Sequence, residues 1–532
     1  MSTPAEFDVR EATVAEIHDA IAGGDCTAVD LVERYQARIA AYDDELNAVL
    51  TLNGDARERA GELDDRFAEE GFTGSLHGVP VLLKDNQDTA DMPTTAGSAA
   101  LADCVPDEDA FVVERLREAG AVILGKANLQ ELSFGVDTIS SLGGATRNAY
   151  DRTHRPSGSS GGTAVAVAAN FALAGTGSDT CSSVRSPPAF NDCVGVRPTR
   201  GLVSRTGIVP LSETQDTAGP VARTVADAAR LLEAMAGYDP ADPVTARGVG
   251  QVPDGGYAVD DGDGALDGAR LGVVRAAFGL NDPESAPESD AAAVTGVVED
   301  ALAELAAAGA TLVDPVEVAD PDRIEQARVV AHEFARDVDR YLAEHADPPQ
   351  DSLAAVHETG EIEPFVAARI EASGALDVDV DGLATDPDYL GRHRRREELR
   401  DTVLARFADA DLDALVYPPS TVPPVEIPAH QPFGEMNCGL AAHTGLPSLV
   451  VPAGFTDDGL PVGVELLGRA FAEPRLFELG TAAERVVDAR RTASDRSRRS
   501  ERGRADASRR RDAPWLALAN RRFLESRWNP RV

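Results

Sequence analysis

Apolar positions near the start of the chain recur at a helical spacing. In the segment 28–42, apolar side chains return every three or four residues, as on one face of an α-helix. Thr27 precedes this segment and Asp30 follows three positions later, which is typical of a capping box at a helix start. We therefore expect helices over the first 70 residues, one of them beginning after Thr27.

Further along the chain, short apolar runs alternate with helical patterns. The segment 77–86 contains an apolar run of strand length that ends at Lys84. Residues 108–128 predict a helix that leads into a strand, and strand-like runs return at 412–420 and 446–455. This alternation predicts an α/β fold, which we expect to be a single large domain with a mixed twisted β-sheet surrounded by helices.

The middle of the chain has a different character. Residues 155–220 are rich in Gly, Ser, Thr and Pro, yet they enclose a run of small apolar residues at 163–174 that predicts a buried helix. We expect residues 175–179 to form a turn after this helix. The Gly- and Asp-rich segment 240–270 predicts a surface loop, and residues 285–410 predict amphipathic helices with acidic outer faces.

The charge of the chain excludes several classes of partner. The formal net charge is −40, which repels nucleic acids and anionic lipids. No run of about 20 apolar residues is present, and the N-terminus lacks the basic and apolar regions of a secretory signal. We therefore expect a cytoplasmic protein that binds neither nucleic acid nor membrane.

The segment from 485 to the end departs from this composition. It holds 15 arginines against six acidic residues, a net charge of 15 − 6 = +9. We expect the main domain to span 1–484 and the tail 485–532 to lie outside it. Three interpretations of the tail stay open: a basic arm for an acidic partner, a disordered extension, or the product of a frameshift.

Lysine is almost absent from the chain. Lys84 and Lys126 are its only two lysines, and the remaining basic residues that stay charged are arginines. Such a composition, with its excess of acids, is typical of haloarchaeal proteins, although a GC-rich genome also favours arginine. Because arginine stays protonated near neutral pH whereas lysine can lose its proton, a retained lysine is a candidate for chemistry that needs a titratable amine.

Neither the cysteines nor the histidines indicate a metal site, and the cysteines do not indicate a disulfide framework. The five cysteines, at positions 26, 104, 181, 193 and 438, are odd in number and scattered, with no C-x-x-C pair. We therefore expect neither a disulfide framework nor a zinc site, and no cofactor.

Two serine-containing segments are candidates for catalysis. The segment 158–162, Gly-Ser-Ser-Gly-Gly, lacks the lysine of a phosphate-binding loop. It also lacks the buried strand that precedes a nucleophile elbow, which would use Ser160 with His443. The third interpretation is a turn that holds Ser159 near a second serine. That second serine is Ser183, in a segment where successive backbone N–H groups could form an oxyanion hole; alternatively, these serines are only turn residues.

Several long segments resemble the amidase signature family. They cover about residues 10–480 in family order, with the weakest similarity over 240–410, and they read HGVPVLLKDN, GSSGGTAVAVAA, GSDTCSSVRSP, VGVRPTRGLVSRTGIVPLSETQDTAGPVARTV and GLPSLVVPAGFTDDGLPVGVELLGR. The resemblance implies Lys84 as base, Ser159 as a bridging serine often held by a cis peptide, and Ser183 as nucleophile. It also implies that Asp179 and Arg185 support the nucleophile loop. Ser160 matches a second serine of the bridging loop, and we interpret Lys126 as structural.

The resemblance further implies hydrolysis of the C–N bond of a small carboxylic amide through a covalent acyl-enzyme. The backbone of Thr180, Cys181, Ser182 and Ser183 would form the oxyanion hole, and residues 240–410 would shape the substrate pocket. Cys181 and Ser182 stand where many family members have two glycines, so the class of amide stays open. Cys181 could itself be the nucleophile, but its nearest candidate base is already assigned to the serines.

Two other functions fit the same resemblance. One is the glutaminase subunit of a glutamyl-tRNA(Gln) or aspartyl-tRNA(Asn) amidotransferase, which works in a complex. The Cys181–Ser182 pair departs from its usual pattern, so we do not expect amidotransferase partner subunits. The other is a non-catalytic binding protein on an amidase scaffold. The sequence allows a homo-oligomer.

We predict that the fold loosens in low salt, because dense acidic side chains repel one another when screening is weak. Thermal unfolding followed by circular dichroism should show a melting temperature that falls when molar salt is removed. Full activity and an unchanged melting curve without molar salt would contradict a halophilic origin.

Overall fold

The centre of the protein is a mixed β-sheet of 11 strands. The computed structural model describes residues 7–257, 262–345 and 347–493. Parallel pairs join β2 to β3 and β6, and β9 to β10 and β11, whereas the other neighbours are antiparallel. In sheet order the strands are β1 (Val49–Leu52), β3 (Val122–Ala127), β2 (Pro80–Lys84), β6 (Ala174–Asp179), β8 (Thr217–Ala222), β7 (Val194–Arg197), β12 (Ser448–Phe455), β13 (Pro461–Leu467), β11 (Ala414–Tyr417), β9 (Arg270–Val273) and β10 (Thr311–Val313).

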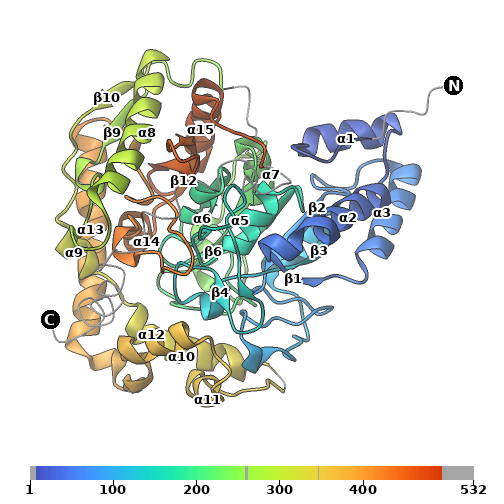
Figure 1. Ribbon diagram of the computed structural model, residues 1–532, viewed down its shortest axis with the longest axis horizontal. Coiled ribbons are helices and arrows are strands. Elements are labelled where there is room, and N and C mark those ends of the chain that lie inside the picture. Colours follow the sequence, from blue (N-terminus) through green and yellow to red (C-terminus); the bar gives the residue numbers. More distant parts are fainter. Residues whose placement is uncertain (1–6, 258–261, 346, 494–532) are drawn as a thin grey trace, which may run out of the picture.

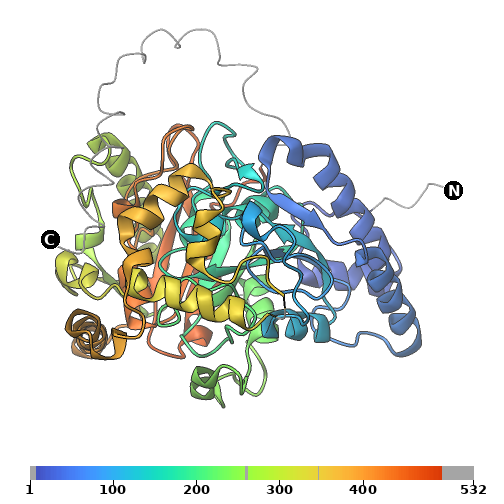
Figure 2. The same ribbon diagram turned by 90° about the horizontal axis from the view of Figure 1, so that it is seen from below.

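Helices surround this sheet, which confirms the predicted fold class. Figure 1 places the N-terminal helices (blue) on one side of the central strands and α8, α9 and α13 (green to orange) on the other, with α10, α11 and α12 below, and Figure 2 shows the molecule from below. A separate pair, β4 (Ile139–Ser140) and β5 (Gly144–Ala145), lies outside the large sheet. The α-helices are α1 (Val14–Gly23), α2 (Ala28–Leu46), α3 (Ala56–Glu70), α4 (Phe111–Glu118), α5 (Gly161–Ala168), α6 (Ser186–Phe190), α7 (Val225–Met235), α8 (Glu288–Ala307), α9 (Pro321–Glu325), α10 (Val330–Ala343), α11 (Leu353–Glu358), α12 (Pro364–Ser373), α13 (Pro387–Asp409), α14 (Gly439–Thr444) and α15 (Glu473–Val487).

The start of α2 has the predicted capping box. The Thr27 side chain accepts a hydrogen bond from the backbone N–H of Asp30, and the Asp30 carboxylate accepts one from the N–H of Thr27. Because both donors at the helix start are satisfied, the helix begins where the sequence predicts. Its apolar face, which includes Leu31 and Tyr35, is buried in the main core.

Strand β12 is buried on both faces, which explains its continuous apolar run. Leu449 and Val451 belong to the main core, together with residues of α7 and α15. Val450, between them, belongs to a smaller cluster with Phe190 of α6. Since successive side chains of a strand point to opposite faces, α6 and α15 cover opposite sides of this part of the sheet.

Three local predictions are wrong. The helix expected over 163–174 ends at Ala168, and residue 174 already belongs to strand β6. Residues 49–52 form strand β1, although we expected helices throughout the first 70 residues, and residues 175–179 belong to strand β6 rather than to a turn. Glycine is a poor strand former, but β6 has hydrogen-bonded neighbours on both sides, β2 and β8. A Cβ on Gly175 would lie 2.6 Å from the Thr163 methyl carbon, so the glycine lets α5 approach the strand. Tertiary contacts therefore override the local preference.

The C-terminal end of the described chain packs against its beginning. Helix α15 extends to Val487, past the predicted boundary at 484, and Arg490 forms an ion pair with Glu11 at 2.8 Å. Residues 494–532 of the predicted tail, and the four residues 258–261 of the predicted loop, lie outside the described residues. Within the described part, none of the helices has the length and apolar composition needed to cross a bilayer.

Candidate active site

Lys84 ends strand β2 with its side chain completely buried. Its Nζ donates hydrogen bonds to the Ser159 hydroxyl, at 2.7 Å, and to the Ser178 hydroxyl, at 2.8 Å. Ser178 lies on β6, the parallel neighbour of β2, and also accepts a hydrogen bond from the Asn86 side chain. The lysine amine is therefore held between two hydroxyl groups.

Ser159 lies in the loop before α5, and the peptide bond that precedes it is cis, as the resemblance implied. The next residue, Ser160, occupies the N-cap position of α5, and its hydroxyl donates a 3.3 Å hydrogen bond to the carbonyl oxygen of Ser178. A Cβ on Gly177 would come within 2.7 Å of the Ser160 hydroxyl. A side chain at position 177 would therefore push this loop, and with it Ser159, away from Lys84.

Ser183 lies in the loop between β6 and α6, which we call the nucleophile loop (residues 180–185). Ser183 is 7% exposed, whereas Lys84 and Ser159 are fully buried, so it is the most exposed member of the predicted triad. Among the described residues, its hydroxyl makes no hydrogen bond to that of Ser159. The structure therefore forms the Lys84–Ser159 half of the relay. Catalytic hydrogen bonds are often longer without substrate and shorten when it binds.

A buried group of charges ties the end of the nucleophile loop to Asp179, the residue that precedes its start. The Asp179 carboxylate accepts hydrogen bonds from the backbone N–H of Val184, at 3.0 Å, and from the guanidinium groups of Arg185 and Arg197. Burial would raise the pKa of Asp179, but the two guanidinium groups outweigh it and hold that pKa below its usual range. Asp179 and Arg185 therefore lie where the sequence predicted a supporting role.

Arg185 also connects the loop to the far half of the sheet. It donates to Glu465 on β13, at 2.7 Å, and to the carbonyl oxygen of Cys438 before α14, at 3.3 Å. Glu465 in turn accepts a hydrogen bond from the hydroxyl of Tyr417 on β11. The ion pairs are fully desolvated, so removal of one partner would leave an uncompensated buried charge.

Two buried groups near the triad have shifted pKa values. Burial lowers the pKa of the Lys84 amine to about 7, although the carboxylates of Asp179 and Asp216 oppose the shift. Burial also raises the pKa of Asp216 to about 6, against the hydrogen bonds that it accepts, one of them from the Thr180 hydroxyl at 2.5 Å. Near neutral pH, a large fraction of Lys84 is therefore uncharged and able to accept a proton.

The prediction that the cysteines form no disulfide is wrong. A disulfide joins Cys181 of the nucleophile loop to Cys438, with their Cα atoms 4.9 Å apart. The two residues are 257 positions apart in the chain, so no local spacing could indicate that they meet. With its sulfur in a disulfide, Cys181 has no thiolate to act as a nucleophile.

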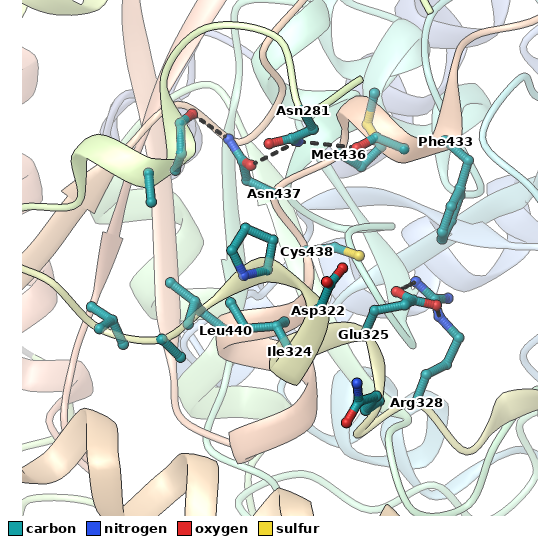
Figure 3. Close-up of a pocket in the computed structure, with 18 of the residues that line it drawn as sticks. Asn281, Asp322, Ile324, Glu325, Arg328, Phe433, Met436, Asn437, Cys438 and Leu440 are labelled. Carbon is teal, nitrogen blue, oxygen red and sulfur yellow. Dashed lines mark hydrogen bonds and ion pairs between the residues drawn. The ribbon is translucent and has the colours of Figure 1, made fainter. Parts of the chain in front are cut away.

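A cavity of about 640 Å³ opens beside this disulfide. Figure 3 shows Cys438 in its wall, between the hydrogen-bonded pair Asn281–Asn437 and the side chains of α9. The Arg328 guanidinium lies 3.9 Å from the Cys181 sulfur and stacks over the Phe433 ring. The cavity therefore adjoins the nucleophile loop through the disulfide, although the three triad side chains are not part of its lining.

A second cavity of about 360 Å³ borders Ser178, Thr180 and Asp216. Thr180 belongs to the nucleophile loop, Ser178 bonds to Lys84 and Asp216 bonds to Thr180, so this cavity borders the predicted site directly. The larger cavity combines apolar side chains with amide and charged groups, which is the usual composition of a ligand site.

The remaining candidates lie elsewhere. Lys126 is buried and donates to the carbonyl oxygen of Gln87 and to Thr94, at 2.7 and 2.9 Å, which agrees with the structural role that we assigned to it. The His443 ring makes a 2.8 Å hydrogen bond to the carbonyl oxygen of Ile324 and does not contact Ser160. The geometry therefore gives no support to an elbow that pairs Ser160 with His443.

Sequence analysis missed three residues of this site. Ser178 and Asp216 lie inside segments that carry the family resemblance, so their positions were visible, but their contacts with Lys84 and Thr180 depend on strand pairing. Cys438 follows a polar segment with no recognisable pattern. Only the folded chain brings it to the nucleophile loop.

Most of the chain is similar to proteins of one family. A model of the amidase family matches residues 30–477. A probable amidase of Arabidopsis thaliana is 35% identical over 501 residues, which cover 90% of this chain and 91% of the relative. A glutamyl-tRNA(Gln) amidotransferase subunit of a Synechococcus strain is 33% identical over 512 residues, with 90% and 97% covered. The crystal structure of native peptide amidase from Stenotrophomonas maltophilia has a TM-score of 0.80 at 37% identity, covering 91% of this chain and 98% of its own.

We predict that the Lys84 amine titrates near pH 7, because burial disfavours its charged form. Labelling with lysine that carries ¹³C only at Cε gives two side-chain signals, since the chain has two lysines, and Lys84→Met assigns them. The chemical shift of the Lys84 signal should move through a midpoint about 3 pH units below the ordinary lysine value. A signal that stays that of a charged amine up to pH 10 would contradict the prediction.

Proposed function

The chain belongs to the amidase family, and from this premise we propose that it hydrolyses a linear carboxylic amide to the acid and ammonia or an amine. The observation that carries the proposal is the 2.7 Å hydrogen bond from the buried Lys84 amine to Ser159. A buried amine with a pKa of about 7 is a base suited to neutral solution. Ser183, at 7% exposure, is the most exposed of the three proposed catalytic residues.

In the proposed mechanism, neutral Lys84 takes a proton from Ser159, which takes one from Ser183. The Ser183 oxygen attacks the amide carbon, and the relay then protonates the leaving nitrogen so that the C–N bond breaks. Water attacks the resulting acyl-enzyme by the same route and releases the acid. Each proton therefore moves through two hydroxyl groups, and no histidine is required.

The tetrahedral intermediate needs hydrogen-bond donors for its negative oxygen. We assign this role to the backbone of Thr180, Cys181, Ser182 and Ser183. Among the described residues, the N–H groups of Cys181, Ser182 and Ser183 donate to no protein acceptor, which supports the assignment. Hydrogen bonds from Val184 and Arg185 to Asp179 hold the end of the same loop.

The composition of the chain supports a proposal for the cell compartment and the salt concentration in which the enzyme works. We propose a free-standing amidase that works in the cytoplasm of an organism with a salty interior, because a net charge of −40 is tolerated best under strong screening. The 640 Å³ cavity beside Cys438 is large enough for the acyl or leaving group of a medium-sized amide. The similarity to a peptide amidase supports amidated peptides as the first substrates to assay.

A second candidate is the glutaminase subunit of an amidotransferase, which would need partner subunits. The similarity to a glutamyl-tRNA(Gln) amidotransferase subunit over 97% of its length favours this candidate. Purification from the native cells distinguishes the two. A free-standing amidase elutes without other subunits and cleaves several amides, whereas the glutaminase of an amidotransferase elutes with partners and uses glutamine.

We predict that Ser183→Ala lowers amide hydrolysis by roughly a thousandfold or more, because the acyl-enzyme cannot form. A panel of aliphatic, aromatic, peptide and glutamine amides assayed in high salt measures this effect. A fluorophosphonate should label the unmodified protein at Ser183 and leave the variant unlabelled. Label on another residue, or equal rates, would exclude Ser183 as nucleophile, and no label at all would favour a non-catalytic binding protein.

We predict that Lys84→Arg lowers the rate by about 10² to 10⁴, because a guanidinium group cannot accept a proton near neutral pH. Lys126→Arg is the matched control, since it makes the same change at a buried lysine away from Ser159. Melting curves of both variants test their folding. If Lys84→Arg keeps most of the rate, lysine is not the base.

A further inference from the structure

The disulfide lies where the proposed reaction is most sensitive to position. Cys181 is one of the proposed oxyanion-hole residues and stands two positions before Ser183. Its partner Cys438 belongs to a different part of the chain, immediately before α14. Both residues are buried. The bond therefore ties the middle of the nucleophile loop to a separate structural element.

Weaker contacts hold the other positions of the loop. The Thr180 hydroxyl bonds to Asp216, and the Ser186 hydroxyl bonds to both the carbonyl and the hydroxyl oxygen of Ser182, at 3.1 Å. At Cys181, by contrast, the side chain is held by a covalent bond, the disulfide to Cys438. A backbone donor displaced by about 1 Å loses much of its value in an oxyanion hole, because such donors must be organised before the charge develops.

The disulfide also borders open space. Cys438 lines the 640 Å³ cavity, so a small thiol can approach its sulfur from that side (Figure 3). The Arg328 guanidinium lies 3.9 Å from the Cys181 sulfur, at 12% side-chain exposure. A neighbouring positive charge stabilises a thiolate and makes it a better leaving group in thiol–disulfide exchange.

We propose that Cys438 is a positioning residue, that it acts through Cys181, and that a dithiol reductant switches the enzyme to a slower state. This proposal rests on the amidase function proposed above. A dithiol thiolate attacks the Cys438 sulfur, the S–S bond breaks, and Cys181 leaves as a thiolate beside Arg328 and then takes up a proton. The second thiol of the reductant displaces Cys438 as a thiol, so that the reductant ends as a cyclic disulfide and two electrons have passed to the protein.

The released loop should affect the transition state more than substrate binding. Oxyanion donors act mainly on the charge that develops during reaction, so their displacement lowers kcat with little change in KM. A cytoplasmic disulfide is usually transient or redox-sensing, which agrees with a switch rather than a permanent brace.

The test equilibrates the full-length protein in buffers with increasing ratios of reduced to oxidised dithiothreitol, in high salt. Amide hydrolysis is measured on one portion of each sample, and the number of thiols alkylated after acid quenching and denaturation is measured on another. We expect kcat to fall about tenfold or more, with KM changed less than about threefold, as the thiol count rises from three to five. Oxidation should restore both values at one common midpoint.

Variants assign the effect to this bond. Cys438→Ser should have the low kcat of the reduced enzyme and no response to dithiothreitol. Cys26→Ser, at a buried free cysteine outside the site, should keep both the activity and the response. If Cys438→Ser does not fold, the reversible titration of the unmodified protein still decides the question.

Three results would overturn the proposal: five reactive thiols in the oxidised protein, unchanged kcat once all five thiols have appeared, or a response that persists in Cys438→Ser. Failure of the amidase function itself looks different. In that case, the oxidised protein cleaves no amide of the panel and a fluorophosphonate does not label Ser183.

Discussion

The chemistry that we propose for this protein depends on burying one lysine amine beside two hydroxyl groups. Lys84 is fully buried, and its Nζ lies 2.7 Å from the Ser159 hydroxyl and 2.8 Å from that of Ser178. Neither hydroxyl carries a charge that would hold the amine protonated, and the desolvated ammonium is unfavourable. Burial therefore brings the pKa of the amine to about 7, which suits the base of the proposed reaction. An arginine at this position would remain a buried cation.

The remainder of the site keeps a reactive loop in place beside that amine. Asp179, Arg185 and Glu465 form a chain of buried charges that runs from β6 to β13. The disulfide from Cys181 to Cys438 adds a covalent connection to the same region. The ion pairs and the disulfide both join elements that are distant in sequence. The nucleophile loop therefore reaches its position only when the whole sheet has assembled.

Much of the fold was accessible from local patterns. The capping box at Thr27, the apolar run before Lys84 and the helices of residues 285–410 all depend on contacts within a few residues, and the structure has each of them. Strand β6 was misread as a turn because its glycines are weak strand formers. Its identity comes from ladder bonds to β2 and β8, which no window of the sequence contains.

The sequence by itself determined which residue types are present and in what order: an almost lysine-free chain that keeps Lys84, two serine-rich segments that match the amidase family, and most local elements. These depend on composition and on neighbours along the chain. The tertiary structure alone decided that the pKa of the Lys84 amine falls to about 7, that this amine also bonds to Ser178, and that Cys181 meets Cys438 beside a cavity. The reason is that desolvation and long-range pairing exist only after segments up to 257 residues apart have packed together.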